Sequence, residues 1–154
     1  MTLIGVKAST KDVDFMLPVE NEYSYLIKTL KSLGYKEVGV SKWKRKGEIW
    51  EFDLYKNNNI FTTELLESPM EGNNHIKLES IGSIYVGILN YYDLIISKLM
   101  RGSGVDFDDC RMLIKAKPKE IDINTLKKRW NETIKYDISE ERIRGHLDFL
   151  LARI

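Results

Sequence analysis

The spacing of apolar residues divides the chain into a strand-rich first part and a helical second part. Alternating or continuous apolar runs predict strands over residues 13–17, 35–40, 48–55, 75–80 and 83–89. Between the first two strands, apolar residues recur at helical spacing up to Gly34, which suits the end of a helix. From Asn90 onward the spacing is helical. The pattern therefore predicts an α+β fold in which a sheet is backed by a small helical bundle.

Turn-forming and capping residues add local predictions. The basic stretch 42–47 is predicted to form the loop of a hairpin, because Gly47 suits a tight turn. A short helix is predicted around residues 61–67, before Pro69. Helix N-caps are predicted at Asn90, Asp106, Asp122 and Ser139. The last helix should carry one apolar stripe, formed by Ile143, Leu147, Leu150, Leu151 and Ile154.

Length and charge limit the classes of protein to consider. A chain of 154 residues is long enough for one hydrophobic core and short for two. We therefore predict a single domain over residues 1–154, with a strand-rich core over 1–89 and a helical part over 90–154. Lys and Arg number 24 against 23 Asp and Glu, so the net charge favours neither general nucleic-acid binding nor an acidic ligand sink.

Composition also bears on where the protein works. The single cysteine, Cys110, cannot form an intrachain disulfide and lies on an apolar stripe that predicts a core position. We find no leader and no apolar run near the roughly 20 residues that span a bilayer, so we expect a cytoplasmic protein without membrane contact. Glutamine is absent while Lys, Glu and Ile are abundant, a composition typical of heat-adapted proteins.

Four carboxylates are predicted to share one face of the sheet. In a strand, successive side chains point to opposite faces, so Asp12 and Asp14 point the same way, as do Glu51 and Asp53. If these two strands pair, the carboxylates form a cluster that repels itself unless a cation balances it. Mg²⁺ prefers oxygen ligands and also bridges substrate phosphates, which favours a metal–nucleotide site. The alternative is that these residues are exposed charges or salt-bridge partners of nearby lysines.

Two stretches carry a resemblance to a known family. Residues 3–15, LIGVKASTKDVDF, resemble the hhGxRxTxDhD stretch of nucleotidyltransferase-like proteins. Residues 92–113 are similar to the DLIxxKLxRxxxxDxxDhxxL helix pair of the same superfamily. The minimal, antitoxin-like members (the MNT, AbiEii and DUF6036 types) are the most similar. The resemblance implies a nucleotidyltransferase-like mixed β-sheet with flanking helices and a C-terminal helical bundle.

The resemblance also implies roles for individual residues. By position, Asp12, Asp14 and Asp53 would be the catalytic carboxylates and the ligands of Mg²⁺, while Lys98, Lys7 and Thr10 would contact the nucleotide. Two metal ions about 3.5–4 Å apart would then activate an acceptor oxygen and stabilise the leaving pyrophosphate. The family's Gly-Ser turn, which holds the triphosphate, is not found upstream of Asp12, and a lysine stands at position 7 where arginine is usual.

Lys98 has two interpretations. It falls near the middle of the apolar face formed by Leu94, Ile95 and Leu99, where an unpaired ammonium would be costly. It either reaches the carboxylate cluster or its ligand, or it forms a salt bridge with Asp106 or Asp109 on the next helix.

Three functional hypotheses remain open from the sequence. The favoured one is a degenerate, non-catalytic, antitoxin-like protein that binds a toxin-like protein partner. The second is active, metal-dependent transfer of a nucleoside monophosphate to a hydroxyl of a protein or an RNA. The third is nucleic-acid binding through residues 42–46, where Trp43 is flanked by cations.

Overall fold

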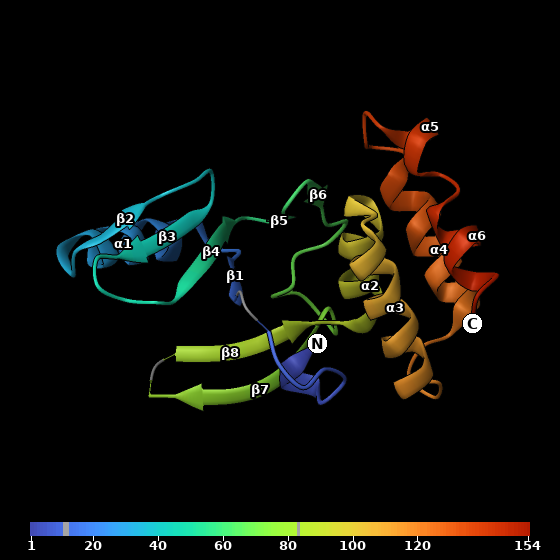
Figure 1. The fold of residues 1–154 in the computed structure, drawn as a ribbon, viewed down its shortest axis with the longest axis horizontal. Helices are drawn as coiled ribbons and strands as arrows, with labels where there is room; N and C mark the ends of the chain where they lie inside the picture. The colour runs from blue at the N-terminus through green and yellow to red at the C-terminus, as the bar shows by residue number, and fades with distance from the viewer. Residues whose placement is uncertain (11–12, 83) are drawn as a thin grey trace.

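The chain forms a four-stranded sheet with one helix against it, a separate hairpin, and a group of helices (Figure 1). The computed structural model describes residues 1–10, 13–82 and 84–154. The strands are β1 Val13–Leu17, β2 Tyr35–Glu37, β3 Lys42–Arg45, β4 Glu51–Lys56, β5 Asn59–Ile60, β6 Thr63–Glu64, β7 His75–Ile81 and β8 Ile84–Leu89. The helices are η1 Thr2–Ile4, α1 Glu20–Ser32, α2 Tyr91–Arg101, α3 Gly104–Ala116, α4 Ile123–Ile134, α5 Glu140–Ile143 and α6 His146–Leu151.

The main sheet has the strand order β1-β4-β3-β2 and is mixed. β1 runs parallel to β4, whereas the pairs β4–β3 and β3–β2 are antiparallel. A parallel pair needs a crossover, which here passes through α1, β2 and β3. The predicted α+β class, with a mixed sheet and a helical C-terminal part, is therefore confirmed.

One face of this sheet is covered by α1. Pro18 follows β1, and Gly34 adopts φ 87° after α1, a left-handed conformation that glycine reaches without a Cβ clash. Between these points the buried side of α1 packs on the sheet through Leu30, which contacts a cluster containing Trp43 and Leu54. Because Trp43 and Phe52 are register partners, their side chains share this covered face.

The helical part has a larger core of its own. The cluster is formed by apolar residues of α2, α3, α4, α5 and α6, and its most buried members include Ile95, Leu99, Leu113 and Leu126. The N-terminal residues Met1, Ile4 and Val6 pack against it, so the first residues of the chain lie against the helices. The predicted core position of Cys110 is confirmed, since this side chain is fully buried.

The prediction for the basic stretch 42–47 is wrong in one respect. Residues 42–45 form strand β3, and only the following residues turn, with Gly47 at φ 88°. Trp43 is 1% exposed, so its indole cannot stack on a nucleobase. The alternation of Lys42 and Lys44 around Trp43 is a two-residue period, which is the pattern of a strand with one buried face.

Other boundaries also differ from the predictions. The described residues 61–67 contain no helix, because the short strand β6 and turns occupy this stretch. Asp106 is not an N-cap; Ser103 caps α3 and Asp106 completes the capping box from the third helical position. Asn90 and Asp122 are N-caps as predicted, whereas Ser139 takes the N-cap position without a side-chain bond.

The last predicted helix is interrupted. Its residues divide between α5 and α6, although Ile143, Leu147 and Leu150 still share one buried side. Ile154 lies beyond α6 and is 46% exposed.

Candidate functional site

The uncovered face of the main sheet holds the predicted carboxylates. In the parallel β1–β4 pair, Asp14 is the register partner of Asp53. Register partners on neighbouring strands lie about 5 Å apart and point to the same face. Since Phe52 and Leu54 belong to the face covered by α1, Asp14 and Asp53 point away from that helix. The sheet therefore brings together two carboxylates that come from distant parts of the sequence.

A hydroxyl contacts Asp53, and two lysines on the same face pair with the neighbouring Glu51. Ser41 Oγ donates a hydrogen bond to Asp53 Oδ1 at 2.6 Å. Lys44 Nζ lies 2.7 Å and Lys42 Nζ 3.5 Å from Glu51, and these contacts lower the pKa of Glu51, with the Lys44 hydrogen bond as the largest cause. We call this surface, formed by Asp14, Ser41, Lys42, Lys44, Glu51, Asp53 and Tyr55, the polar face. It contains charges of both signs.

The end of α2 reaches the polar face through an aromatic contact. The ring of Phe61 lies 5.0 Å from that of Tyr55, and the guanidinium of Arg101 lies 4.1 Å from the Phe61 centroid. Arg101 also forms an ion pair with the buried carboxylate of Asp106. Its hydrogen bonds to Asp106 raise the pKa of Arg101, and the charge of Asp14 adds to this. Arg101 is therefore a cation within electrostatic reach of the carboxylate pair.

The charges of Asp53 and Asp14 also affect the pKa of Tyr55. Burial raises the pKa of Tyr55, a hydrogen bond with Ser41 opposes the change, and the charges of Asp53 and Asp14 reinforce it. The phenol therefore stays protonated and can donate a hydrogen bond on this face.

The two lysines assigned to nucleotide contacts are paired with the helical part. Lys7 Nζ lies 2.7 Å from Asp109 Oδ1, and Lys98 Nζ lies 2.8 Å from Asp109 Oδ2. Lys98 is also 3.8 Å from Asp106. The salt-bridge alternative for Lys98 is thus what the structure contains. Burial favours a raised pKa at Asp109, but the hydrogen bonds from Lys7 and Lys98 outweigh it, so the pKa lies below its ordinary value of 3.8.

The remaining predicted site residues can be placed only in part. Asp12 lies outside the described residues, and Thr10 is exposed shortly before β1. Within 1–10, 13–82 and 84–154, no three His, Cys, Asp or Glu side chains gather in a group that could hold a metal ion. Asp14 and Asp53 supply two carboxylates in register, and carboxylate oxygens are the donors that Mg²⁺ prefers.

Sequence reasoning did not include three residues of this surface. Ser41, Tyr55 and the adjoining Phe61 were missed because their positions relative to Asp14 and Asp53 depend on strand pairing for Tyr55 and on loop placement for Ser41 and Phe61. Phe61 has a φ of 53°, which is uncommon for a residue with a Cβ. This backbone angle cannot be recognised from the sequence.

Comparison with protein families identifies the family of this chain. Over residues 4–151 it matches the family described as nucleotidyltransferase of unknown function (DUF6036). The match covers nearly the whole chain, so the protein belongs to this family. No curated protein matches it. Nucleotidyltransferase families are generally metal-dependent. In the described part of the chain, no helix is both long and apolar enough to cross a membrane.

Proposed function

We propose that this chain is an antitoxin-like binding module built on the nucleotidyltransferase fold, which engages a toxin-like protein partner and does not transfer nucleotides. One observation carries the proposal. Lys7 and Lys98, the cations that the family resemblance assigns to the nucleotide, are both paired with Asp109. A nucleotide phosphate would have to compete with this carboxylate for both cations, most of all for Lys98, whose side chain is 14% exposed.

Displacing Asp109 from Lys98 has a cost. The Asp109 side chain is 6% exposed and that of Lys98 is 14% exposed, so neither charge is well hydrated when separated from the other. Asp109 would keep its contact with Lys7, and Lys98 would keep Asp106 at 3.8 Å, so the cost lies below about 3–5 kcal/mol, the cost of leaving a buried charge wholly uncompensated. Phosphate contacts with Lys98 must exceed this cost before they contribute to affinity.

Exposed apolar residues support a protein partner. In the loop between β3 and β4, Ile49 is 83% and Trp50 is 65% exposed, although both belong to residue types that are usually buried. Adjacent large apolar side chains on a loop are typical of protein contacts.

Active nucleotidyl transfer is the second candidate, because Asp14 and Asp53 are register partners on the polar face. A bound divalent metal would polarise the substrate phosphates and activate an acceptor hydroxyl. In this candidate, Asp14 and Asp53 hold the metal, with Asp12 as the third carboxylate. Arg101 then contributes positive charge near the transferred phosphate, which requires its contact with Asp106 to loosen.

Calorimetric titration of Mg²⁺–ATP and the other nucleoside triphosphates separates the two candidates. The variants are Asp14→Asn/Asp53→Asn and, as a control, Glu71→Gln on an exposed loop. For a binding module, we expect no saturable nucleotide binding in any of the proteins. Saturable binding that disappears only in the double variant would refute the first proposal and favour the second.

The partner is sought among the products of neighbouring genes. Each is co-expressed with the chain, and the complex is measured by size-exclusion chromatography with light scattering. We expect one stable complex, which the Asp14→Asn/Asp53→Asn variant still forms. Transfer of label from an α-labelled nucleoside triphosphate to such a protein, abolished in that variant, would identify the chain as an enzyme.

A further inference from the structure

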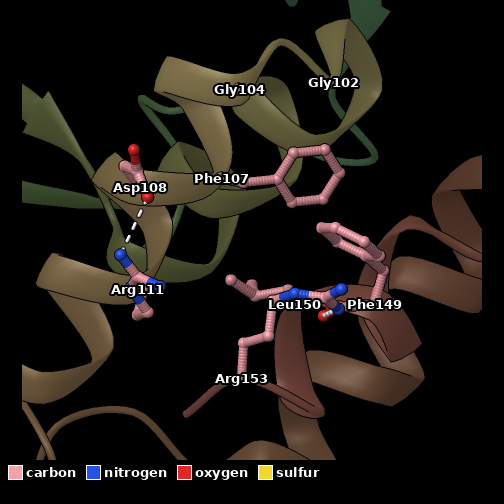
Figure 2. A pocket seen from close by; sticks show the side chains of 8 residues that line it. All are labelled: Gly102, Gly104, Phe107, Asp108, Arg111, Phe149, Leu150 and Arg153. Carbon is pink, nitrogen blue, oxygen red and sulfur yellow. Dashed lines mark hydrogen bonds and ion pairs between the residues drawn. The ribbon is translucent and has the colours of Figure 1, made fainter.

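A groove lies between α3 and α6, on the helical part of the fold (Figure 1; Figure 2). It encloses about 480 Å³ and is lined on one side by Phe107, Asp108 and Arg111, and on the other by Phe149 and Arg153. Neither the family match nor the proposed function assigns a role to these residues.

Two phenylalanines are among the residues that line the groove. The rings of Phe107 and Phe149 meet edge to face, with centroids 4.9 Å apart and an interplanar angle of 63°. Phe107 also contacts the ring of His146 at 5.4 Å. Phe149 remains 45% exposed despite these contacts. Figure 2 shows the two rings next to each other, with the guanidinium of Arg153 against Phe149 and Arg111 farther away.

The groove carries two guanidinium groups. Arg153 Cζ lies 3.5 Å from the centroid of Phe149, and Arg153 Nη1 donates to the Phe149 carbonyl oxygen at 3.0 Å. This stacking fixes the guanidinium while its other N–H groups remain available. Arg111 forms a surface ion pair with Asp108, at 2.9 Å. With two guanidinium groups against one carboxylate, the lining has an excess of one positive charge, and Arg153 is the cation that its contacts hold in place.

The apolar surface continues beyond the lining. Val105 is 63% and Met112 is 42% exposed on α3, and they flank Asp108 at helical spacing. Exposed apolar side chains interspersed with cations are typical of a surface that receives an amphipathic helix.

We propose that this groove binds an amphipathic helix from a protein partner, with apolar residues along one side and acidic residues that reach Arg111 and Arg153. The proposal rests on the proposed function, because it names the surface through which the module engages its partner. A carboxylate from the partner meets Arg153 in place and can replace Asp108 at Arg111. Leucine-sized side chains cover the exposed edge of Phe149.

The geometry favours a peptide over a nucleotide. One face of Phe149 is covered by Arg153, and Phe107 and Phe149 meet edge to face, so the two rings do not form a parallel pair between which a base would stack. Aliphatic side chains need only the ring edges and the neighbouring Met112. The two arginines offer carboxylates the planar, two-pronged contact that guanidinium groups prefer.

The test uses two synthetic helical peptides and the ¹⁵N-labelled full chain. One peptide has leucines at positions i, i+3, i+4 and i+7 with glutamates beside them; the other has lysine at each glutamate. Amide shifts report where each peptide binds and how tightly. The variant Arg111→Ala/Arg153→Ala is compared with Arg142→Ala/Arg144→Ala, at the last turn and C-cap of α5, which removes the same charge elsewhere.

We expect the glutamate peptide to shift amides of α3 and α6, and to bind about tenfold more weakly to the Arg111→Ala/Arg153→Ala variant. The α5 variant should bind like the wild type. The charge-reversed variant Arg111→Glu/Arg153→Glu should bind the lysine peptide instead, which shows that any loss is not simple misfolding.

Three results would overturn the inference. They are equal affinity in all variants, shifts confined to other elements, and shifts of the same α3 and α6 amides by ATP. The fate of the proposed function is separate. A partner complex that does not depend on Arg111 and Arg153 would refute the role of the groove but not the proposal of a binding module. Nucleotide transfer that depends on Asp14 would refute the proposal of a binding module.

Discussion

The end of α2 depends on a glycine that no other residue can replace without cost. Gly102 has φ 68°, and a Cβ added there would lie 2.4 Å from His146 Cε1 and 2.8 Å from His146 Nδ1. His146 Nδ1 donates to the Leu99 carbonyl oxygen at 2.7 Å, a carbonyl in the last turn of α2. The change Gly102→Ala therefore strains the backbone and displaces the imidazole that caps this helix.

The magnitude follows from these two effects. Placing alanine in the left-handed conformation costs about 1–2 kcal/mol. Losing the hydrogen bond from His146 to Leu99 costs about 1 kcal/mol, and the displaced ring also loses part of its contact with Phe107. We expect Gly102→Ala to lower the free energy of unfolding by about 2–4 kcal/mol.

Urea unfolding, followed by tryptophan fluorescence and circular dichroism at constant m-value, measures this loss. Gly104→Ala is the control, because no atom lies within 4 Å of its added Cβ, and we expect it to change stability by less than about 1 kcal/mol. In a His146→Ala background the cost of Gly102→Ala should fall to about 1–2 kcal/mol, the backbone strain alone. Equal costs of Gly102→Ala in both backgrounds would refute the steric argument.

Three further predictions concern the sheet core, an ion pair and the cysteine. Trp43→Ala should lower the free energy of unfolding by about 3–5 kcal/mol, since this indole is 1% exposed and fills the cluster under α1; urea unfolding measures it. Asp109→Asn should destabilise the protein near neutral pH by about 2 kcal/mol and flatten the acid limb of stability against pH. Cys110 is 0% exposed and burial raises its pKa to about 12, so a thiol reagent should label it only at the rate of unfolding.

Each of these has a matched control. Trp50→Ala, at 65% exposed, should change stability little, and a loss as large as that of Trp43→Ala would contradict the assignment of the core. Asp108→Asn is the control for Asp109→Asn. Because the pKa of Asp109 is lowered in the folded state, its contribution is complete above 3.8 and is lost as pH falls through the folded pKa. Rapid native labelling of Cys110 would show that α3 opens locally.

Much of the fold could be predicted because its elements are marked by short-range signals. Pro18, Gly34, Asn90 and Asp122 delimit elements in ways that depend on a few neighbouring residues. The helix expected around residues 61–67 failed because apolar residues there are buried by contacts with distant elements, and burial alone does not specify a helix. In β3, the charge of the lysines hid a two-residue period that was present in the sequence.

In the candidate site, too, features set by short-range signals could be predicted and features set by distant contacts could not. The face that Asp14 and Asp53 take follows from strand alternation, so their common orientation could be predicted once the two strands were assumed to pair. Their exact opposition depends on the parallel register, which no local residue sets. The contribution of Ser41 and Arg101 depends on loop and helix placement and was beyond reach of spacing.

The partner of Lys7 is the clearest example of information that a motif does not contain. The resemblance places Lys7 beside Thr10 and Asp12 in sequence and so suggests a shared role with the carboxylates. In the fold, Met1, Ile4 and Val6 pack on the helical core, and Lys7 contacts Asp109 there, together with Lys98. The same two lysines therefore attach the N-terminal segment to α2 and α3. A loss of function on changing Lys7 supports nucleotide binding only if Lys7→Ala and Asp109→Asn differ in nucleotide affinity after their stability losses are matched.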